Sequence, residues 1–214
     1  PLPPEEIINR AVAQMKSSTG FHFAIDRSGA PAFLDPGETL SFRRAEGDYV
    51  APDRASAVVR VIAPGLVAEV QVISIGDRYW ETNVLTGEWQ ELPPDLAFNP
   101  ATLFDPQTGL QPILESDLSD LTLAGVAELE ESPGQPLYHV IGLLDAGRIY
   151  DLSFGLIGPG QVDAQLWIAP ETFDVYRIEI VEPPAEGAEG SEETTTWQVD
   201  FWNFDKTVEI LPPQ

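Results

Sequence analysis

The sequence contains no cysteine, so it has no disulfide framework, no thiol nucleophile and no thiolate metal site. Basic residues are scarce too, with 11 Lys and Arg against 35 Asp and Glu and a formal net charge of −24. Such a chain lacks the basic face that nucleic-acid binding needs, and charge does not draw it to an anionic membrane surface. We therefore expect no nucleic-acid partner, and we interpret the charge chiefly as a source of solubility.

Long apolar runs are also missing, since none approaches the roughly 18 residues of a membrane-spanning helix. The chain begins PLPPEE, without an initiator methionine or a signal-type apolar segment, so we expect any export signal or anchor to lie upstream of residue 1. With 43% hydrophobic residues, the 214 residues can bury a substantial core. No composition shift marks a boundary, which predicts a single domain over 1–214.

Signals for catalysis are absent from the sequence. There is no G-x-S-x-G elbow, and GLIGPG at 155–160 predicts a turn because Pro159 removes a backbone donor and no helix follows. His22 and His139 lie inside strand patterns, so we expect sheet residues and not metal ligands. We expect no enzymatic activity, no cofactor and no metal.

The secondary-structure pattern predicts one helix followed by many strands. A helix is expected over 4–18, where Ile8, Val12 and Met15 recur at helical spacing behind two prolines. From Phe21 onward the period is two, which predicts about ten or eleven strands in an antiparallel meander. The strand-like runs are 21–27, 39–51, 55–63, 66–75, 78–83, 88–92, 121–130, 136–144, 162–169, 175–182, 195–204 and 206–211.

Two further segments interrupt this pattern. The Glu-rich stretch 182–193 predicts a long hairpin tip, and its spacing resembles no calcium-binding loop. The stretch 99–116 has two apolar bursts, Leu103-Phe104 and Leu110 to Leu114, separated by Asp105-Pro106 and Gly109. Each burst is too short for a self-sufficient helix and too apolar for a bare loop. We expect two short amphipathic helices that are buried against the sheet.

A sheet of this size can curl, and its concave face must then be filled by side chains, helices or a ligand. Alternation indicates that one apolar face contains Val58, Val70, Val72, Leu166 and Ile178. If the two short helices do not fill the hollow, a cavity remains. The alternative is that they fill it and leave an ordinary core.

The run from Tyr79 to Leu114 resembles the mycobacterial LppX/LprA/LprF/LprG lipoproteins. Like them, it has a tyrosine in a strand (RYWETN), then Trp89 at the end of a hairpin, then NPATLFDPQTGLQPILES. Weaker similarity extends along the chain, through the FHF strand, LTLAGVAELE and VDAQLWIAPETFDVYRIEI.

The resemblance implies a LolA-like fold of the α+β class, mostly β. A single curved antiparallel sheet would form a half barrel, with the N-terminal helix and the short central helices on its concave face. It also implies an exported, non-catalytic protein that is anchored to the cell membrane by an acylated N-terminal cysteine, carries acyl lipids or glycolipids, and has a possible envelope transporter as partner. The residues on the cavity side of the central helices would be Leu103, Phe104, Leu110, Ile113 and Leu114.

This sequence departs from the family pattern in its charge and in the acidic stretch 182–193. An acidic rim suits neutral or cationic headgroups better than phosphate groups. The anchoring cysteine is not in the sequence and is expected upstream. The main alternative to a lipid carrier is an envelope protein-binding or sensor module with the same fold, and a hydrolase would need polar groups that converge in the hollow.

Overall fold

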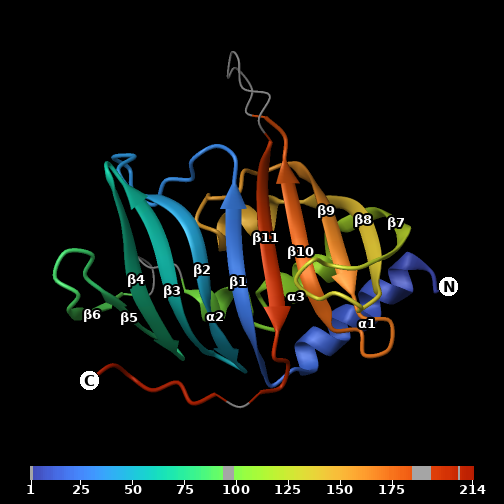
Figure 1. Ribbon diagram of the computed structural model, residues 1–214, viewed down its shortest axis with the longest axis horizontal. Coiled ribbons are helices and arrows are strands. Elements are labelled where there is room, and N and C mark those ends of the chain that lie inside the picture. Colours follow the sequence, from blue (N-terminus) through green and yellow to red (C-terminus); the bar gives the residue numbers. More distant parts are fainter. Residues whose placement is uncertain (1, 94–98, 185–193, 207) are drawn as a thin grey trace.

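The computed structural model describes residues 2–93, 99–184, 194–206 and 208–214. Its strands are β1 (Gly20–Ser28), β2 (Ser41–Val50), β3 (Arg54–Ala63), β4 (Leu66–Ile75), β5 (Arg78–Thr82), β6 (Trp89–Leu92), β7 (Leu118–Ala127), β8 (Leu137–Asp145), β9 (Gln161–Ile168), β10 (Val175–Glu182) and β11 (Thr195–Trp202). They form one 11-stranded sheet in the order β6-β5-β4-β3-β2-β1-β11-β10-β9-β8-β7. Strands that are consecutive in sequence pair antiparallel within each half, and β1 pairs with β11 to join the two halves (Figure 1).

The sheet is curved and open, as predicted. Its two outer strands are β6 and β7. Strand β7 carries irregularities in its pairing with β8, between Ser119 and Thr122 and between Leu123 and Gly125. Such bulges bend an edge strand and make it a poor template for pairing with another chain.

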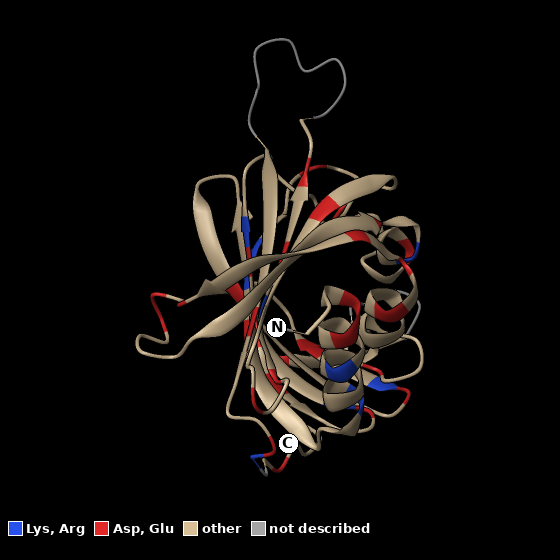
Figure 2. Cartoon of the chain, turned by 90° about the vertical axis from the view of Figure 1, so that its right-hand side faces the viewer, with Lys and Arg blue, Asp and Glu red and all other residues tan. Residues whose placement is uncertain are grey.

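The helices of the described residues lie on the concave side of the sheet (Figure 2). They are α1 (Pro4–Ser17), α2 (Pro100–Leu103), α3 (Leu110–Ser116) and α4 (Gly147–Leu152). The predicted N-terminal helix is confirmed, and its buried stripe packs against α3 and β7. Helix α4 had no counterpart among the predicted elements. Over the described ranges, no helix is both long enough and apolar enough to cross a membrane.

The central segment folds as two short helices with a sharp bend, as predicted. The Asn99 side chain caps α2 by accepting a hydrogen bond from the Ala101 N–H at 2.8 Å. In the bend, one Asp105 carboxylate oxygen accepts from the backbone N–H groups of Gln107 and Thr108, each at 2.8 Å. The Gly109 N–H donates to the Asp105 carbonyl at 2.8 Å. These hydrogen bonds satisfy backbone N–H groups in the bend, which have no partners within either helix.

The core contains a cluster of aromatic rings where this segment meets the middle of the sheet. Phe104 is fully buried, and its ring centroid lies 4.7 Å from that of Phe23 and 5.1 Å from that of Phe21. Tyr49 and Phe201 complete the cluster at 5.7 and 5.8 Å. Phe104 therefore fastens the central segment to β1, β2 and β11.

The prediction for Val58 is wrong, because this residue lies on the outer face of the sheet. In the β3–β4 register, Val59 is opposite Val70, whereas Val58 is opposite Gln71. Val58 is 41% exposed, and Val59 is buried. Val58 is two residues before Arg60, so both side chains point to the same side of β3, the side that faces water.

The strand expected over 206–211 is also wrong for the described residues of that stretch. Asn203 and Asp205 adopt left-handed backbone conformations, with φ of 53° and 56°, which end the extended run after β11. The tail then crosses the lower end of the sheet (Figure 1), where the Arg54 guanidinium donates to the Ile210 carbonyl at 3.1 Å. The predicted hairpin tip lies between β10 and β11, but its residues 185–193 fall outside the described ranges.

Candidate functional site

A cavity of about 510 Å³ lies between the concave face of the sheet and the helices. Its volume falls within the range of small-molecule sites, which is roughly 300–1,000 Å³. The walls are almost entirely apolar. The lining residues are Ile25, Phe33, Leu34, Leu40, Phe42, Val59, Val61, Val70, Val72, Tyr79, Glu81, Val84, Leu103, Leu110, Ile149, Leu152, Ser153, Phe154, Leu156, Ile157, Ile180, Trp197 and Val199.

The structure divides the predicted cavity residues into two groups and leaves one residue outside both. Four of them line the cavity: Val70, Val72, Leu103 and Leu110. Five are buried in the solid core beside it: Phe104, Ile113, Leu114, Leu166 and Ile178. Val58 lies on the outer face. The central segment thus both fills and lines the hollow, since Phe104 fills the middle of the sheet while Leu103 and Leu110 border open space.

Helix α4 and the turn after it form a wall that sequence reasoning missed. Arg148 joins α4 to α3, because its guanidinium bonds the Asp117 carboxylate at 2.6 Å and the Pro112 carbonyl at 2.9 Å. After α4, Phe154 adopts a left-handed conformation with φ of 54° and is 59% exposed at the edge of the cavity. A non-glycine residue in this conformation is uncommon and marks a locally constrained turn.

The connection between β1 and β2 contributes a second part of the rim, through Phe33 and Leu34. The Asp35 carboxylate holds this connection. It accepts hydrogen bonds from the Leu40 N–H at 2.6 Å, from the Thr39 hydroxyl at 2.7 Å and from the Thr39 N–H at 2.9 Å. These donors stabilise the charged form and lower the pKa of Asp35, with the Leu40 N–H as the largest cause.

We expect the rim to loosen in acid. A carboxyl group whose pKa is lowered by folding stabilises the fold above its unfolded pKa, which is about 3.9 for aspartate, and the stabilisation is lost as pH falls through the folded value. Hydrogen-exchange protection of the Thr39 and Leu40 amides should therefore fall below about pH 4. Asp35→Ala should remove this protection already at pH 7, whereas Glu38→Ala in the same turn should keep it. Equal protection in both variants at pH 7 would contradict this role of Asp35.

Polar groups are few among the lining residues and are already engaged. The Tyr79 hydroxyl donates to the Glu81 carboxylate at 3.4 Å, and burial raises the pKa of Tyr79. Ser153 Oγ accepts from the Ile157 N–H at 3.1 Å and donates to the Tyr150 carbonyl at 3.3 Å. Ser153 therefore caps a turn, and among the described residues its hydroxyl has no hydrogen bond to a base, as a nucleophile would need.

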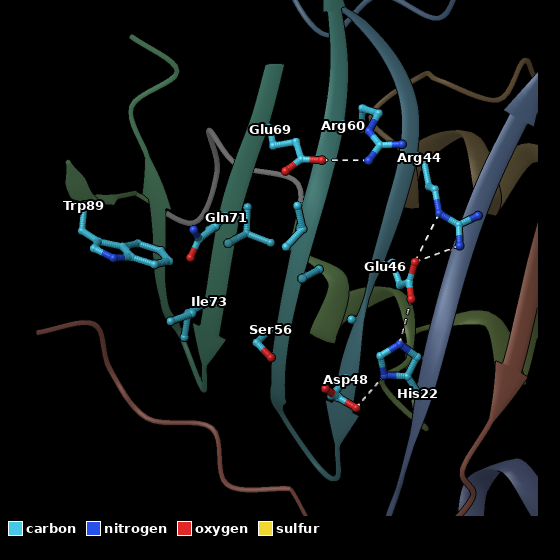
Figure 3. Close-up of a pocket in the computed structure, with 14 residues that line it drawn as sticks. His22, Arg44, Glu46, Asp48, Ser56, Arg60, Glu69, Gln71, Ile73 and Trp89 are labelled. Carbon is cyan, nitrogen blue, oxygen red and sulfur yellow. Dashed lines mark hydrogen bonds and ion pairs between the residues drawn. The ribbon is translucent and has the colours of Figure 1, made fainter. Parts of the chain in front are cut away.

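The outer face of the sheet is polar and has a different character. There, a shallow hollow of about 580 Å³ is lined by charged side chains that pair with one another and by apolar residues that include Val58, Ile73 and Trp89 (Figure 3). His22 contacts Asp48 at 2.8 Å and Glu46 at 3.3 Å, and Arg44 also bonds Glu46, at 2.8 Å. His139 packs on Trp167 in the sheet. Both histidines are sheet residues, and over the described ranges no group of His, Asp and Glu residues is arranged to hold a metal ion.

Fold and site together define an open half barrel with helices on its concave face and an apolar cavity between them. The chain belongs to the LppX_LprAFG lipoprotein family, whose sequence model matches residues 3–210. Members of this family are envelope-associated, extracytoplasmic lipoproteins, and the family is not known for catalysis. The family resemblance drawn from the Tyr79–Leu114 run is confirmed.

Two solved structures have the same fold. LprF from Mycobacterium bovis is 17% identical, with a TM-score of 0.72, and the match covers 98% of this chain and 96% of LprF. LppX from Mycobacterium tuberculosis is 18% identical, with a TM-score of 0.65, over 96% of this chain and 97% of LppX. No curated protein sequence matches the chain. At these identities, the two structures establish the fold and leave the ligand open.

Proposed function

We propose that the protein holds an acyl lipid or glycolipid in the cavity and carries or presents it at the cell envelope without chemical change. The observation that carries the proposal is the cavity itself, because helices α2 and α3 leave about 510 Å³ of apolar space against the sheet. Each methylene group moved from water into such a space contributes about 0.8 kcal/mol. Acyl chains can therefore be held there with little polar recognition.

Membership in a lipoprotein family supports a location on the outer side of a membrane. An acylated cysteine upstream of residue 1 would supply the anchor, and an envelope transporter is the class of partner that would deliver or accept the lipid. A protein-binding or sensor module is the competing proposal, and it fits a cavity that takes up no ligand.

Lipid uptake by the purified protein tests the proposal. The protein should be delipidated by mild organic extraction, refolded if necessary, mixed with a fluorescent acyl lipid and analysed by native mass spectrometry. We expect a protein ion with one bound lipid, and competition by unlabelled lipid. Delipidated protein that is folded by circular dichroism and takes up no lipid of any headgroup would favour the protein-binding module.

A matched pair of valine substitutions tests whether the ligand binds on the concave face of the sheet. Val70→Trp inserts an indole into the cavity, so we expect lipid occupancy to fall severalfold while the midpoint of urea unfolding changes little, since the side chain enters open space. Val58→Trp puts the same group on the outer face and should leave occupancy unchanged. If Val70→Trp lowers occupancy and stability together, the position belongs to a packed core.

A further inference from the structure

Arg27 stands apart from the other basic residues of this acidic chain. Ion pairs with Asp or Glu engage Arg10, Lys16, Arg44, Arg60, Arg78, Arg148 and Arg177. Arg27 is only 7% exposed, yet within the described part of the chain its guanidinium makes neither an ion pair nor a hydrogen bond, and its Nε is enclosed without an acceptor. A buried cation without hydrogen-bond acceptors is costly, so the position of Arg27 favours a ligand that supplies acceptors.

The register of the sheet places Arg27 beside the cavity, although Arg27 is not itself one of the lining residues. Along β1 it follows Ile25 on the concave face, and it is the cross-strand partner of Trp197 on β11. Both neighbours line the cavity. The guanidinium carbon lies 5.2 Å from the centre of a Trp197 ring, whose other contact is a stacked Phe42 at 5.5 Å. The charged group therefore lies next to Trp197, an aromatic residue of the cavity wall.

Glu182 acts on Arg27 by charge, but in the described part of the chain the two side chains form neither an ion pair nor a hydrogen bond, and the Glu182 carboxylate oxygens have other partners. One accepts from the Trp197 indole N–H at 2.8 Å, and the other accepts from the Gly158 N–H at 2.7 Å. Burial lowers the pKa of Arg27, and the nearby Glu182 charge partly opposes this effect. Glu182 thus offsets part of the charge and orients Trp197, while the guanidinium N–H groups make no hydrogen bond to any described residue.

We propose that Arg27 binds the anionic headgroup, a carboxylate or a phosphate ester, of an acyl lipid whose chains occupy the cavity. The proposal rests on the lipid-carrier function above. A guanidinium can donate two parallel hydrogen bonds to a carboxylate or a phosphate, and this match is strongest where water is excluded. It reverses, at this one position, the preference for neutral or cationic headgroups that the overall charge predicts.

Headgroup discrimination by the delipidated protein tests the proposal. Binding of palmitic acid is compared with binding of methyl palmitate, and phosphatidic acid is compared with diacylglycerol of the same chains, by displacement of a fluorescent lipid. We expect the wild-type protein to prefer the anionic member of at least one pair. Arg27→Met, which keeps an unbranched side chain and removes the charge, should weaken that anionic ligand about tenfold to a hundredfold and leave its neutral counterpart unchanged.

Two further variants control this experiment. Arg27→Lys keeps the positive charge and should retain part of the preference, whereas Arg60→Met on the outer face should retain all of it. The pair that shows the preference identifies carboxylate or phosphate as the ligand group. If Arg27→Met does not fold, the wild-type preference and the Arg27→Lys variant decide the question.

Each possible result has a distinct meaning. If the wild-type protein binds the neutral and anionic members of both pairs equally, Arg27 is no headgroup site, although the carrier function stands. If Arg27→Met weakens neutral and anionic ligands alike, Arg27 supports only the cavity wall, and the proposal is overturned. If the wild-type protein binds none of the four lipids, the carrier function fails and this inference fails with it.

Discussion

Replacing Phe104 by alanine is expected to lower the free energy of unfolding by about 3–5 kcal/mol, the cost of removing a buried aromatic ring. The ring is fully enclosed, and it contacts Phe21, Phe23, Tyr49 and Phe201 from three strands. Its loss would leave a cavity that these rigid neighbours, held by the sheet, are poorly able to fill. Because Phe104 joins the central segment to the sheet, lipid uptake should also fall.

Urea unfolding followed by tryptophan fluorescence measures this effect. Phe154→Ala is the matched control, because Phe154 is 59% exposed at the cavity rim and its truncation should change stability by less than about 0.5 kcal/mol. An equal loss of stability in the two variants would show that the cluster around Phe104 is not the main attachment of the central segment.

Replacing Gly109 by alanine is expected to cost about 1–3 kcal/mol, the range for a residue too large for its site. A methyl group at Gly109 would lie 2.4 Å from the Leu103 carbonyl oxygen and 2.7 Å from the Asp105 carbonyl oxygen. Both contacts involve backbone atoms, so helices α2 and α3 must move apart to relieve them. Since the side chains of Leu103 and Leu110 line the cavity, we also expect weaker lipid binding.

Gly147→Ala is the control for this substitution. The added methyl group there would meet only the Asp145 side chain, at 3.3 Å. Gly147 is also the first residue of helix α4, where alanine is favoured over glycine. We expect unchanged or slightly raised stability in urea unfolding, and unchanged lipid uptake. A Gly109→Ala protein as stable as Gly147→Ala would show that the bend tolerates a change of geometry.

The fold was largely predictable because it rests on local signals. Alternation located the strands, and the bend in the central segment followed from Asp105-Pro106 and Gly109. It was harder to predict which β3 residues face the cavity. Val58 and Val59 are adjacent and both apolar, so either choice of inward-facing residues gives an apolar face. Arg60, two residues after Val58, was the available signal for the outer face.

The site was less predictable because it depends on pairing between distant segments. Arg27 meets Trp197 only because β1 pairs with β11, strands that are far apart in the sequence. Helix α4 is short, and its role comes from the Arg148 contacts with α3 and not from its own periodicity. The misassigned strand at 206–211 alternates convincingly, but Asn203 and Asp205 turn the chain away before it can pair.

The open outer edges of β6 and β7 bear on the size of the lipid that the proposed carrier would hold. A closed barrel has a radius fixed by its strand number and stagger. Here the sheet ends at β6 on one side and β7 on the other, so its curvature can widen through small twists shared among all the strand pairs, without breaking a backbone hydrogen bond. In the proposed carrier, the largest lipid would be set by how far α2 and α3 can separate from the sheet, and the contacts of Phe104 with β1, β2 and β11 oppose that separation.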